Sequence, residues 1–393
     1  MRIAGRRYDT AEPVVLEIAR GTIRCVDPAA AAGNAVASWP WLAPGLLDMQ
    51  VNGYEGQEFS AADLTAEKVA RIVRAYDAFG VTRSCPTLFT QSFETMRHAL
   101  ATIGAACESP EVGRRIAGIH VEGPYISPHD GPRGAHPRAH CRRPDWDEFQ
   151  RFQEAAGGRI RIVTLSPEFD EAPAFIERLV RSGVVAAIGH TAADSAQIGA
   201  AVDAGARLST HLGNGAHPLL PRHPNYIWDQ LADDRLWASL IVDGHHLPPA
   251  VVKTVVRAKG ASRCILISDL SGLAGLAPGR YEANHGAVEL LDDGRLVVAG
   301  QRQILAGASS PVGAGIANVM RFAGVDLADA VRMAVEHPAR LLGSDPGGIE
   351  PGMPADLVQF DLVEGGGPGA PARFEPRCTI VDGESVWGNR WHP

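Results

Sequence analysis

The stretch GVVAAIGHTAADSAQIGAAVDAGARLSTHL (residues 183–212) contains the unit that decides the fold. It begins with a short apolar run from Val184 to His190, continues with an amphipathic stretch from Ala193 to Ala204, and ends with a second apolar run, Leu208 to His211. Short runs of this kind are typical of buried strands, and the stretch between them is typical of a helix. The segment therefore predicts two parallel strands joined by a helix.

The same alternation continues on both sides of this unit. Eight strands with intervening helices predict a closed (β/α)₈ barrel of the TIM type over about residues 45–340. An open doubly wound sheet is the alternative, but no GxGxxG fingerprint follows the first strand. The predicted strands are Gly45–Asp48, Val81–Cys85, Ile116–His120, Ile160–Leu165, Val184–His190, Leu208–His211, Trp237–Val242 and Cys264–Ser268, and the helices include Ala62–Phe79, Pro173–Ser182, Ala193–Ala204 and Pro248–Ala258.

Both ends of the chain depart from this alternation and contain short strands only. We expect these strands to pair into a small β-sandwich domain built from both termini, residues 1–43 and 345–393, beside a barrel at residues 44–344. The predicted strands are Val14–Ile18, Thr22–Val26, Ala355–Phe360, Cys378–Val381 and Glu384–Trp387.

The composition excludes several classes of function. A net charge of −8, from 37 basic and 45 acidic residues, argues against nucleic acid or an anionic membrane as the partner. The six cysteines form no CxxC pair, which favours free thiols in a reducing compartment. The opening MRIAGRRYDT lacks the apolar core of a signal peptide, and no run of about 18 apolar residues occurs. We therefore expect a cytoplasmic protein that acts on a small molecule.

Polar side chains follow four of the predicted barrel strands. Glu122 follows the third strand, His190 and His211 end the fifth and sixth, and Asp269 follows the eighth. In a barrel these carboxyl ends surround the active-site mouth. Each residue alone has an ordinary structural interpretation, such as a hydrogen-bonded histidine or a helix-capping aspartate. Together, two imidazoles and a carboxylate favour a catalytic divalent ion, and the second carboxylate favours proton transfer during amide hydrolysis.

The motifs resemble the N-acetylglucosamine-6-phosphate deacetylases of the amidohydrolase superfamily. The resemblance covers nearly the whole chain in the family's order, and it implies hydrolysis of the N-acetyl group of an amino sugar, with glucosamine 6-phosphate and acetate as products. The motifs are PGLLDMQVNG (44–53), GIHVEGPYISP (118–128), IGHTAAD (188–194), DAGARLSTHLGNGAHP (203–218), VDGHHLPP (242–249), LISDLSGLAGLAPGRY (266–281), ILAGAS (304–309) and GIEPGMPADLVQFD (348–361).

The resemblance also implies a role for individual residues. Glu122, His190 and His211 correspond to metal ligands, Asp269 to the general base and acid, and His136 to the histidine that contacts the acetyl carbonyl. Arg222 and His246 fall where the family binds the sugar phosphate, often across a dimer interface, so a homodimer is expected. The residues with implied substrate contacts are Gln50, Asn214, Gly215, Arg222 and His246. On an extended segment only one of the neighbours His245 and His246 can face the pocket.

The expected cofactor is one divalent ion per subunit, with Zn²⁺ preferred and Fe²⁺, Co²⁺ or Mn²⁺ as alternatives. Gln50 and Asn52 occupy the place of the His-x-His pair of many amidohydrolases, and amides are poor ligands for a second such ion. Residues 213–217 depart from the family's pattern. This departure leaves open an unphosphorylated N-acetyl sugar or related N-acyl compound as substrate. A catalytically silent barrel with a binding or scaffolding role is the third hypothesis.

Overall fold

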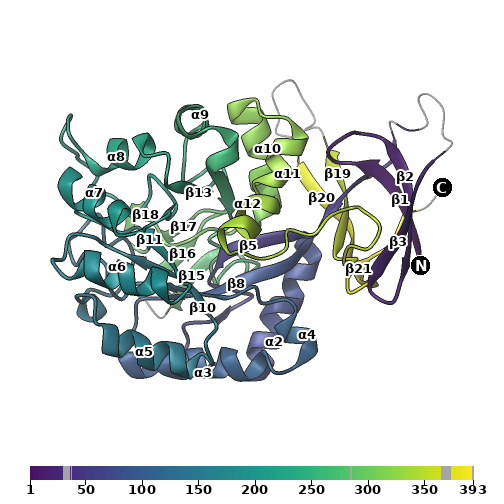
Figure 1. Ribbon diagram of the computed structural model, residues 1–393. Helices are drawn as coiled ribbons and strands as arrows, with labels where there is room; N and C mark the ends of the chain where they lie inside the picture. Colours follow the sequence, from purple (N-terminus) through teal and green to yellow (C-terminus); the bar gives the residue numbers. More distant parts are fainter. Residues whose placement is uncertain (30–35, 37, 284–285, 364–372, 392–393) are drawn as a thin grey trace.

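The computed structural model describes residues 1–29, 36, 38–283, 286–363 and 373–391 (Figure 1). Its centre is a sheet of eight parallel strands in the order β14-β13-β12-β11-β10-β9-β8-β5. A parallel bridge between Val51 and Leu270 joins the two ends of the sheet, which confirms the predicted (β/α)₈ barrel. The strands are β5 (Leu46–Val51), β8 (Val81–Phe89), β9 (Ile119–Glu122), β10 (Ile160–Leu165), β11 (Val185–Ile188), β12 (Leu208–Ser209), β13 (Trp237–Ile241) and β14 (Cys264–Ile267).

Helices that connect or follow these strands cover the outside of the barrel (Figure 1). They are α2 (Ala66–Ala75), α3 (Phe93–Ala106), α4 (Pro110–Gly113), α5 (Trp146–Ala155), α6 (Ala172–Arg181), α7 (Ser195–Asp203), α8 (Tyr226–Ala232), α9 (Pro249–Lys259), α10 (Val312–Ala323), α11 (Leu327–Arg332) and α12 (Glu336–Leu341). Among the described residues, none of the helices has the length and apolar character needed to cross a membrane.

Capping side chains explain where two predicted helices begin. The stretch predicted from Ala62 starts only at Ala66, because the hydroxyl of Thr65 accepts the N–H of Lys68. Likewise, α7 starts after Asp194, whose carboxylate accepts the N–H of Gln197 while the Gln197 side chain accepts the N–H of Asp194. Such reciprocal caps satisfy N–H groups that have no partner inside the helix.

Side chains of successive strand residues pack on opposite faces of the barrel wall. In β10, Ile162 joins the apolar cluster that fills the barrel, whereas Val163 packs outward with the helices. Both side chains are fully buried. This two-sided burial explains why the strands have nearly continuous apolar sequences. Because the barrel interior is filled, polar chemistry is confined to its ends.

The chain ends form a second sheet of seven strands, in the order β21-β20-β19-β4-β1-β2-β3. Figure 1 shows this sheet beside the barrel, with both ends of the chain near it. The predicted β-sandwich domain from both termini is confirmed, whereas its boundaries at residues 43 and 345 stay a prediction. The strands are β1 (Arg2–Arg7), β2 (Pro13–Ala19), β3 (Thr22–Pro28), β4 (Trp41–Pro44), β19 (Leu357–Val363), β20 (Arg373–Val381) and β21 (Glu384–Gly388).

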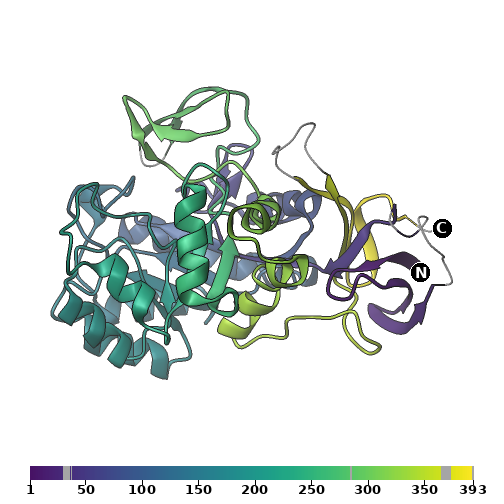
Figure 2. The ribbon, with the colours of Figure 1, turned by 90° about the horizontal axis from the view of Figure 1, so that it is seen from above.

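A four-stranded antiparallel sheet, here called the lid sheet, was not expected from the sequence. It stands off one end of the barrel (Figure 2) and has a small apolar core of its own. Its strands are β15 (Gly279–Ala283), β16 (Gly286–Leu290), β17 (Leu296–Val298) and β18 (Gln301–Leu305). The Asp-Asp-Gly turn at 292–294 between two apolar runs is a hairpin signal that could have revealed it. A two-stranded ribbon, β6 (Gly53–Tyr54) and β7 (Gln57–Glu58), follows β5.

Candidate active site

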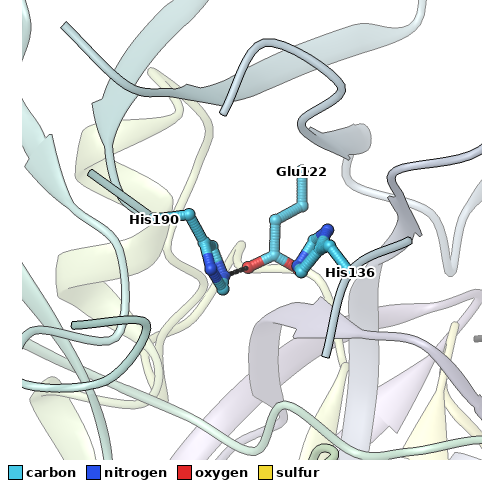
Figure 3. Close-up of side chains that lie close together, drawn as sticks. All are labelled: Glu122, His136 and His190. Atoms are coloured by element: carbon cyan, nitrogen blue, oxygen red, sulfur yellow. Dashed lines mark ion pairs between the residues drawn. The ribbon is translucent and has the colours of Figure 1, made fainter. Parts of the chain in front are cut away.

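The three predicted metal ligands converge at the carboxyl end of the barrel. Nε2 of His211 lies 2.9 Å and Nε2 of His190 3.3 Å from Oε1 of Glu122. The two imidazole nitrogens are 3.0 Å apart, and all three side chains are buried. Figure 3 shows the carboxylate of Glu122 between His190 and His136.

Three site residues immediately beyond barrel strands have left-handed backbone conformations. The φ angles are 49° at His190, 31° at His211 and 53° at Asp269. Residues with a Cβ rarely adopt this region, and each instance costs about 1–3 kcal/mol. The barrel therefore holds these three side chains at the expense of local backbone strain, as is common at functional sites.

The outer hydrogen bond of His190 fits a ligand of a divalent ion. Nδ1 of His190 donates to the carbonyl of Pro132 at 2.8 Å, so in the neutral ring the Nε2 lone pair faces Glu122 and His211. Ligating histidines commonly donate their second N–H in this way. Nδ1 of His211 is buried without a hydrogen-bond partner among the described residues. Three potential ligand atoms, one carboxylate oxygen and two imidazole nitrogens, thus converge at one point where a divalent cation could bind.

Electrostatics favour positive charge at this point. Burial acts to raise the pKa of Glu122, but the interactions with the nearby imidazoles of His190 and His211 outweigh burial and hold the pKa well below its usual value. Burial acts to lower the pKa of His211, and the bond to Glu122 outweighs it, so this pKa is raised. The carboxylate therefore stays ionised and attracts a cation to the imidazoles.

His136 lies beside this cluster and can act as a hydrogen-bond donor. Its ring nitrogen lies within 4.8 Å of ligand atoms of Glu122 and His190. The backbone N–H of Thr90 donates to Nδ1 at 3.3 Å, so the neutral ring carries its proton on Nε2. A set of Glu122, His136 and His190 would also suit a metal. The 2.9 Å approach of His211 to Glu122 favours His211 as the third ligand.

Two amides hold the carboxylate of Asp269 in place. Oδ1 of Asp269 accepts from Asn52 Nδ2 at 2.8 Å and from Gln50 Nε2 at 3.2 Å, and Gln50 Nε2 also donates to Glu122 Oε1 at 2.9 Å. Burial, followed by the charge of Glu122, raises the pKa of Asp269 to about 6. Gln50 was expected to bind substrate, but it is 1% exposed and lies outside the cavity wall. Its amide instead links the two carboxylates.

A cavity of about 910 Å³ opens above the cluster. Asn214, Gly215 and His246 line it, as expected, and so does His136. Gly215 has φ +56°, and a Cβ there would lie 2.7 Å from Nδ1 of His190, so glycine lets this loop rest on the imidazole. Arg222 is exposed and lies outside the wall of this cavity, so its phosphate role stays a prediction.

Both His245 and His246 line the cavity, so the expectation that only one of them faces it is wrong. The segment is a tight turn rather than an extended strand. Oδ1 of Asp243 accepts the backbone N–H groups of His245 at 2.8 Å and His246 at 2.9 Å. Oδ2 of Asp243 contacts Nδ1 of His246 at 2.8 Å, which orients that ring.

Sequence reasoning missed several charged residues of the cavity wall, among them Glu58, Arg295 and Arg302. Glu58 belongs to β7 and is buried, 8% exposed. The polar stretch YEGQEFS (54–60) after the first barrel strand was the available signal for it. The two arginines belong to the unpredicted lid sheet and its β16–β17 turn, so their place could not be inferred.

Comparison with known proteins places this geometry in a family. The Amidohydrolase family matches residues 41–386. A curated N-acetylglucosamine-6-phosphate deacetylase of Bos taurus is 34% identical over 359 residues, 88% of this chain and 83% of that protein. An N-acetylgalactosamine-6-phosphate deacetylase of Escherichia coli O157:H7 is 32% identical over 348 residues, 88% of this chain and 90% of that protein.

Solved structures agree with this result. A mutant N-acetyl-D-glucosamine-6-phosphate deacetylase from Mycobacterium smegmatis, in complex with N-acetyl-D-glucosamine-6-phosphate, superposes with a TM-score of 0.84. It is 32% identical, and the match covers 98% of this chain and 99% of that chain. The resemblance expected from the motifs is thus confirmed over nearly the full length. The chain belongs to the amidohydrolase family of metal-dependent hydrolases.

Proposed function

We propose that the protein is a metal-dependent deacetylase that hydrolyses N-acetylglucosamine 6-phosphate to glucosamine 6-phosphate and acetate. One observation supports this proposal above the others. Glu122, His190 and His211 meet within 3.3 Å at the floor of a cavity that Asp269 and His136 also line. The N-acetylglucosamine-6-phosphate deacetylase of Bos taurus, which is 34% identical, supports the choice of substrate.

Glu122, His190 and His211 would hold one divalent ion, for which we propose Zn²⁺. When bound, such an ion activates water and polarises a carbonyl group. In its ionised form, Asp269 takes a proton from the attacking water, and it later donates that proton to the departing sugar nitrogen. Asn52 and Gln50 hold Oδ1 of Asp269, which leaves Oδ2 for this transfer.

His136 supplies the second polar interaction of the reaction. Its Nε2–H donates to the acetyl oxygen, which gains negative charge as water adds to the carbonyl carbon. Phe89 packs edge-on against the His136 ring, with ring centroids 6.2 Å apart. Arg133 donates to the backbone carbonyl of His136 at 2.7 Å, so both neighbours restrain the imidazole.

Acetate release from three sugars tests the proposal. We would reconstitute the protein with Zn²⁺ and offer N-acetylglucosamine 6-phosphate, N-acetylgalactosamine 6-phosphate and N-acetylglucosamine. The highest kcat/KM is expected for the first sugar. A preference for the galactosamine derivative would change the sugar but keep the reaction, as the Escherichia coli relative's name suggests. No acetate from any of the three would refute the proposal.

An unphosphorylated N-acetyl sugar is the second candidate substrate. The divergent loop at residues 213–217 favours it, because all five of its residues line the cavity. A loop that rests on His190 and reaches the substrate can change specificity without changing the metal ligands. Equal kcat/KM for N-acetylglucosamine and its 6-phosphate would select this candidate.

We further propose a cytoplasmic homodimer. The segment that carries Arg222 also exposes two large apolar side chains, Leu219 at 88% and Trp228 at 51%, which a partner subunit could cover. The six described cysteines are unpaired, as in a reducing compartment. Light scattering after size exclusion should give twice the chain mass of 41.7 kDa. A monomer at micromolar concentration would contradict the dimer.

A further inference from the structure

The barrel closes at a seam between its first and last strands, β5 and β14, and different groups join the seam at different levels. Near its amino end, the N–H groups of Leu47 and Leu266 donate to the carbonyls of residues 333–334, at 2.9 and 2.8 Å. Near its carboxyl end, the N–H of Asp269 donates directly to the carbonyl of Gln50 at 2.9 Å. A side chain bridges the level between these two.

That side chain is the buried carboxylate of Asp48. Its Oδ1 accepts the backbone N–H of Ser268 from across the seam at 3.1 Å, and the backbone N–H of Gln50 on its own strand at 3.3 Å. Asp48 is 2% exposed and lies outside the wall of the active-site cavity, so its side chain does not reach the substrate. One carboxylate oxygen thus takes the place of a strand carbonyl where the barrel closes.

The backbone on either side of Asp269 depends on the same group of hydrogen bonds. The hydroxyl of Ser268 accepts the N–H of Leu270 at 3.1 Å, and the N–H of Asn52 donates to the carbonyl of Leu270 at 2.8 Å. Asp269 itself has φ 53°, a strained conformation that persists only where the surrounding contacts enforce it. By holding the N–H of Ser268, Asp48 fixes the start of this strained segment.

Asp48 also acts on Asp269 through Gln50. The side-chain amide of Gln50 donates to Oδ1 of Asp269 at 3.2 Å and to Oε1 of Glu122 at 2.9 Å. The backbone N–H of the same residue is the second group that Asp48 accepts. One oxygen of Asp48 therefore holds both the backbone that carries Asp269 and the strand that carries the amide linking Asp269 to Glu122.

The chemistry of Asp48 fits a hydrogen-bond acceptor rather than a fixed charge. Burial raises its pKa to about 7, although the hydrogen bonds from Ser268 and Gln50 act to lower it. A carboxyl group keeps acceptor capacity in its protonated and in its ionised form. The two backbone N–H groups therefore need an oxygen at this position, and the carbonyl oxygen of an asparagine could supply it.

We propose that Asp48 is a positioning residue for the reaction: its oxygen spans the barrel seam and sets the place of Asp269 relative to Glu122. This inference rests on the proposed deacetylase function. Proton transfer from water requires Asp269 in one place, and a displacement of about 1 Å can cost about 10²-fold in rate. Other parts of the cavity wall, such as His136 and His246, lie on other elements, so KM should change little.

A purely structural role for Asp48 is the alternative. In that case its loss would lower stability, and it would lower kcat no more than the loss of a comparable buried hydrogen bond elsewhere. Thr379 on β20 offers that comparison. It is fully buried in the seven-stranded sheet, and its hydroxyl donates to the carbonyl of Asp77 at 2.6 Å. Thr379→Ala therefore removes one buried hydrogen bond away from the seam.

Three variants test the inference: Asp48→Ala, Asp48→Asn and the control Thr379→Ala. We would measure kcat and KM with N-acetylglucosamine 6-phosphate, metal content, urea midpoints, and hydrogen exchange of the amides of residues 268–270. Asp48→Ala should lower kcat about 10- to 100-fold with KM and metal content close to those of the wild type. Asp48→Asn should recover most of this loss, and Thr379→Ala should keep the kcat of the wild type.

Hydrogen exchange reports on the seam without activity or metal. The amides of residues 268–270 should exchange slowly in the wild type, in Asp48→Asn and in Thr379→Ala, and faster in Asp48→Ala. Exchange at these amides that is equally slow in Asp48→Ala would overturn the inference. If the wild-type protein hydrolyses none of the sugars, the proposed function fails instead, and this measurement on the metal-free protein still decides the role of Asp48.

The kinetic outcomes are equally clear. A wild-type kcat in Asp48→Ala would overturn the inference, and so would an equal fall of kcat in Thr379→Ala. Asp48→Asn as impaired as Asp48→Ala would show that charge matters and not the acceptor, which also overturns it. If Asp48→Ala does not fold, Asp48→Asn decides: kcat and exchange close to those of the wild type support the inference, and a loss in either contradicts it.

Discussion

Replacing Asp269 with asparagine should separate catalysis from stability. Oδ1 of Asp269 accepts the two hydrogen bonds from Asn52 and Gln50, and the carbonyl oxygen of an asparagine can accept both. The substitution therefore keeps the local structure and removes only the proton-accepting oxygen. General acid–base catalysis is worth about 10²- to 10⁴-fold. We expect kcat to fall about 10³-fold, with metal content close to that of the wild type.

The same substitution should stabilise the metal-free protein. Burial raises the pKa of Asp269 from 3.8 to about 6, which corresponds to about 3 kcal/mol at 1.36 kcal/mol per pKa unit. Because the folded-state pKa is raised, ionisation destabilises the folded protein as pH rises from about 4 through 6. Asparagine has no such cost. The gain in unfolding free energy should be absent below about pH 4, about half developed at pH 5, and complete above pH 6.

Urea unfolding of metal-free wild type and Asp269→Asn at pH 5 and pH 8 measures this difference. Acetate release and metal analysis on the reconstituted proteins complete the comparison. Added metal should reduce the stability difference, because a nearby cation stabilises the ionised carboxylate. Equal urea midpoints at pH 8 would refute the electrostatic reasoning, and a variant that keeps a tenth of its activity would refute the proton-transfer role. In the reconstituted wild type, kcat/KM should rise with pH as Asp269 ionises, with a midpoint below the metal-free pKa of about 6, because the bound cation stabilises the carboxylate.

Three further sets of substitutions test other parts of the structure. The double substitution Gln50→His and Asn52→His replaces two amides, which are poor metal ligands, with imidazoles beside Glu122 and Asp269. Elemental analysis should then show two metal ions per chain instead of one. His136→Ala should lower kcat about 10²- to 10³-fold and leave the metal content unchanged. His211→Ala should lose the metal. If both variants lose the metal, His136 is a metal ligand. Arg115→Ala should lower the unfolding free energy, measured in urea, by about 3–5 kcal/mol, because Asp77 is left buried without its partner. Arg114 is exposed, so the control Arg114→Ala should lower it by less than about 1 kcal/mol.

Local patterns predicted the barrel and placed most of the candidate site residues at its strand ends. Apolar runs such as Ile160–Leu165 mark strands buried on both faces, and the residues that end or follow them reach the barrel mouth. The lid sheet escaped prediction although its Asp-Asp-Gly turn was visible. Short strands with little buried surface lack the long apolar runs that identify a barrel strand, and their partners depend on the segment around Asp269.

By itself, the sequence determined which residues stand at the strand ends, because strand and helix periodicity depends on neighbours along the chain. Only the tertiary structure decided which of these residues meet. Glu122 and His211 are 89 residues apart, and closure of the barrel brings them to 2.9 Å. The same closure turned Gln50 toward two carboxylates and brought Arg295 to the cavity wall. Periodicity cannot specify such contacts, since they depend on strand register, strained backbone at three residues and the packing of distant segments.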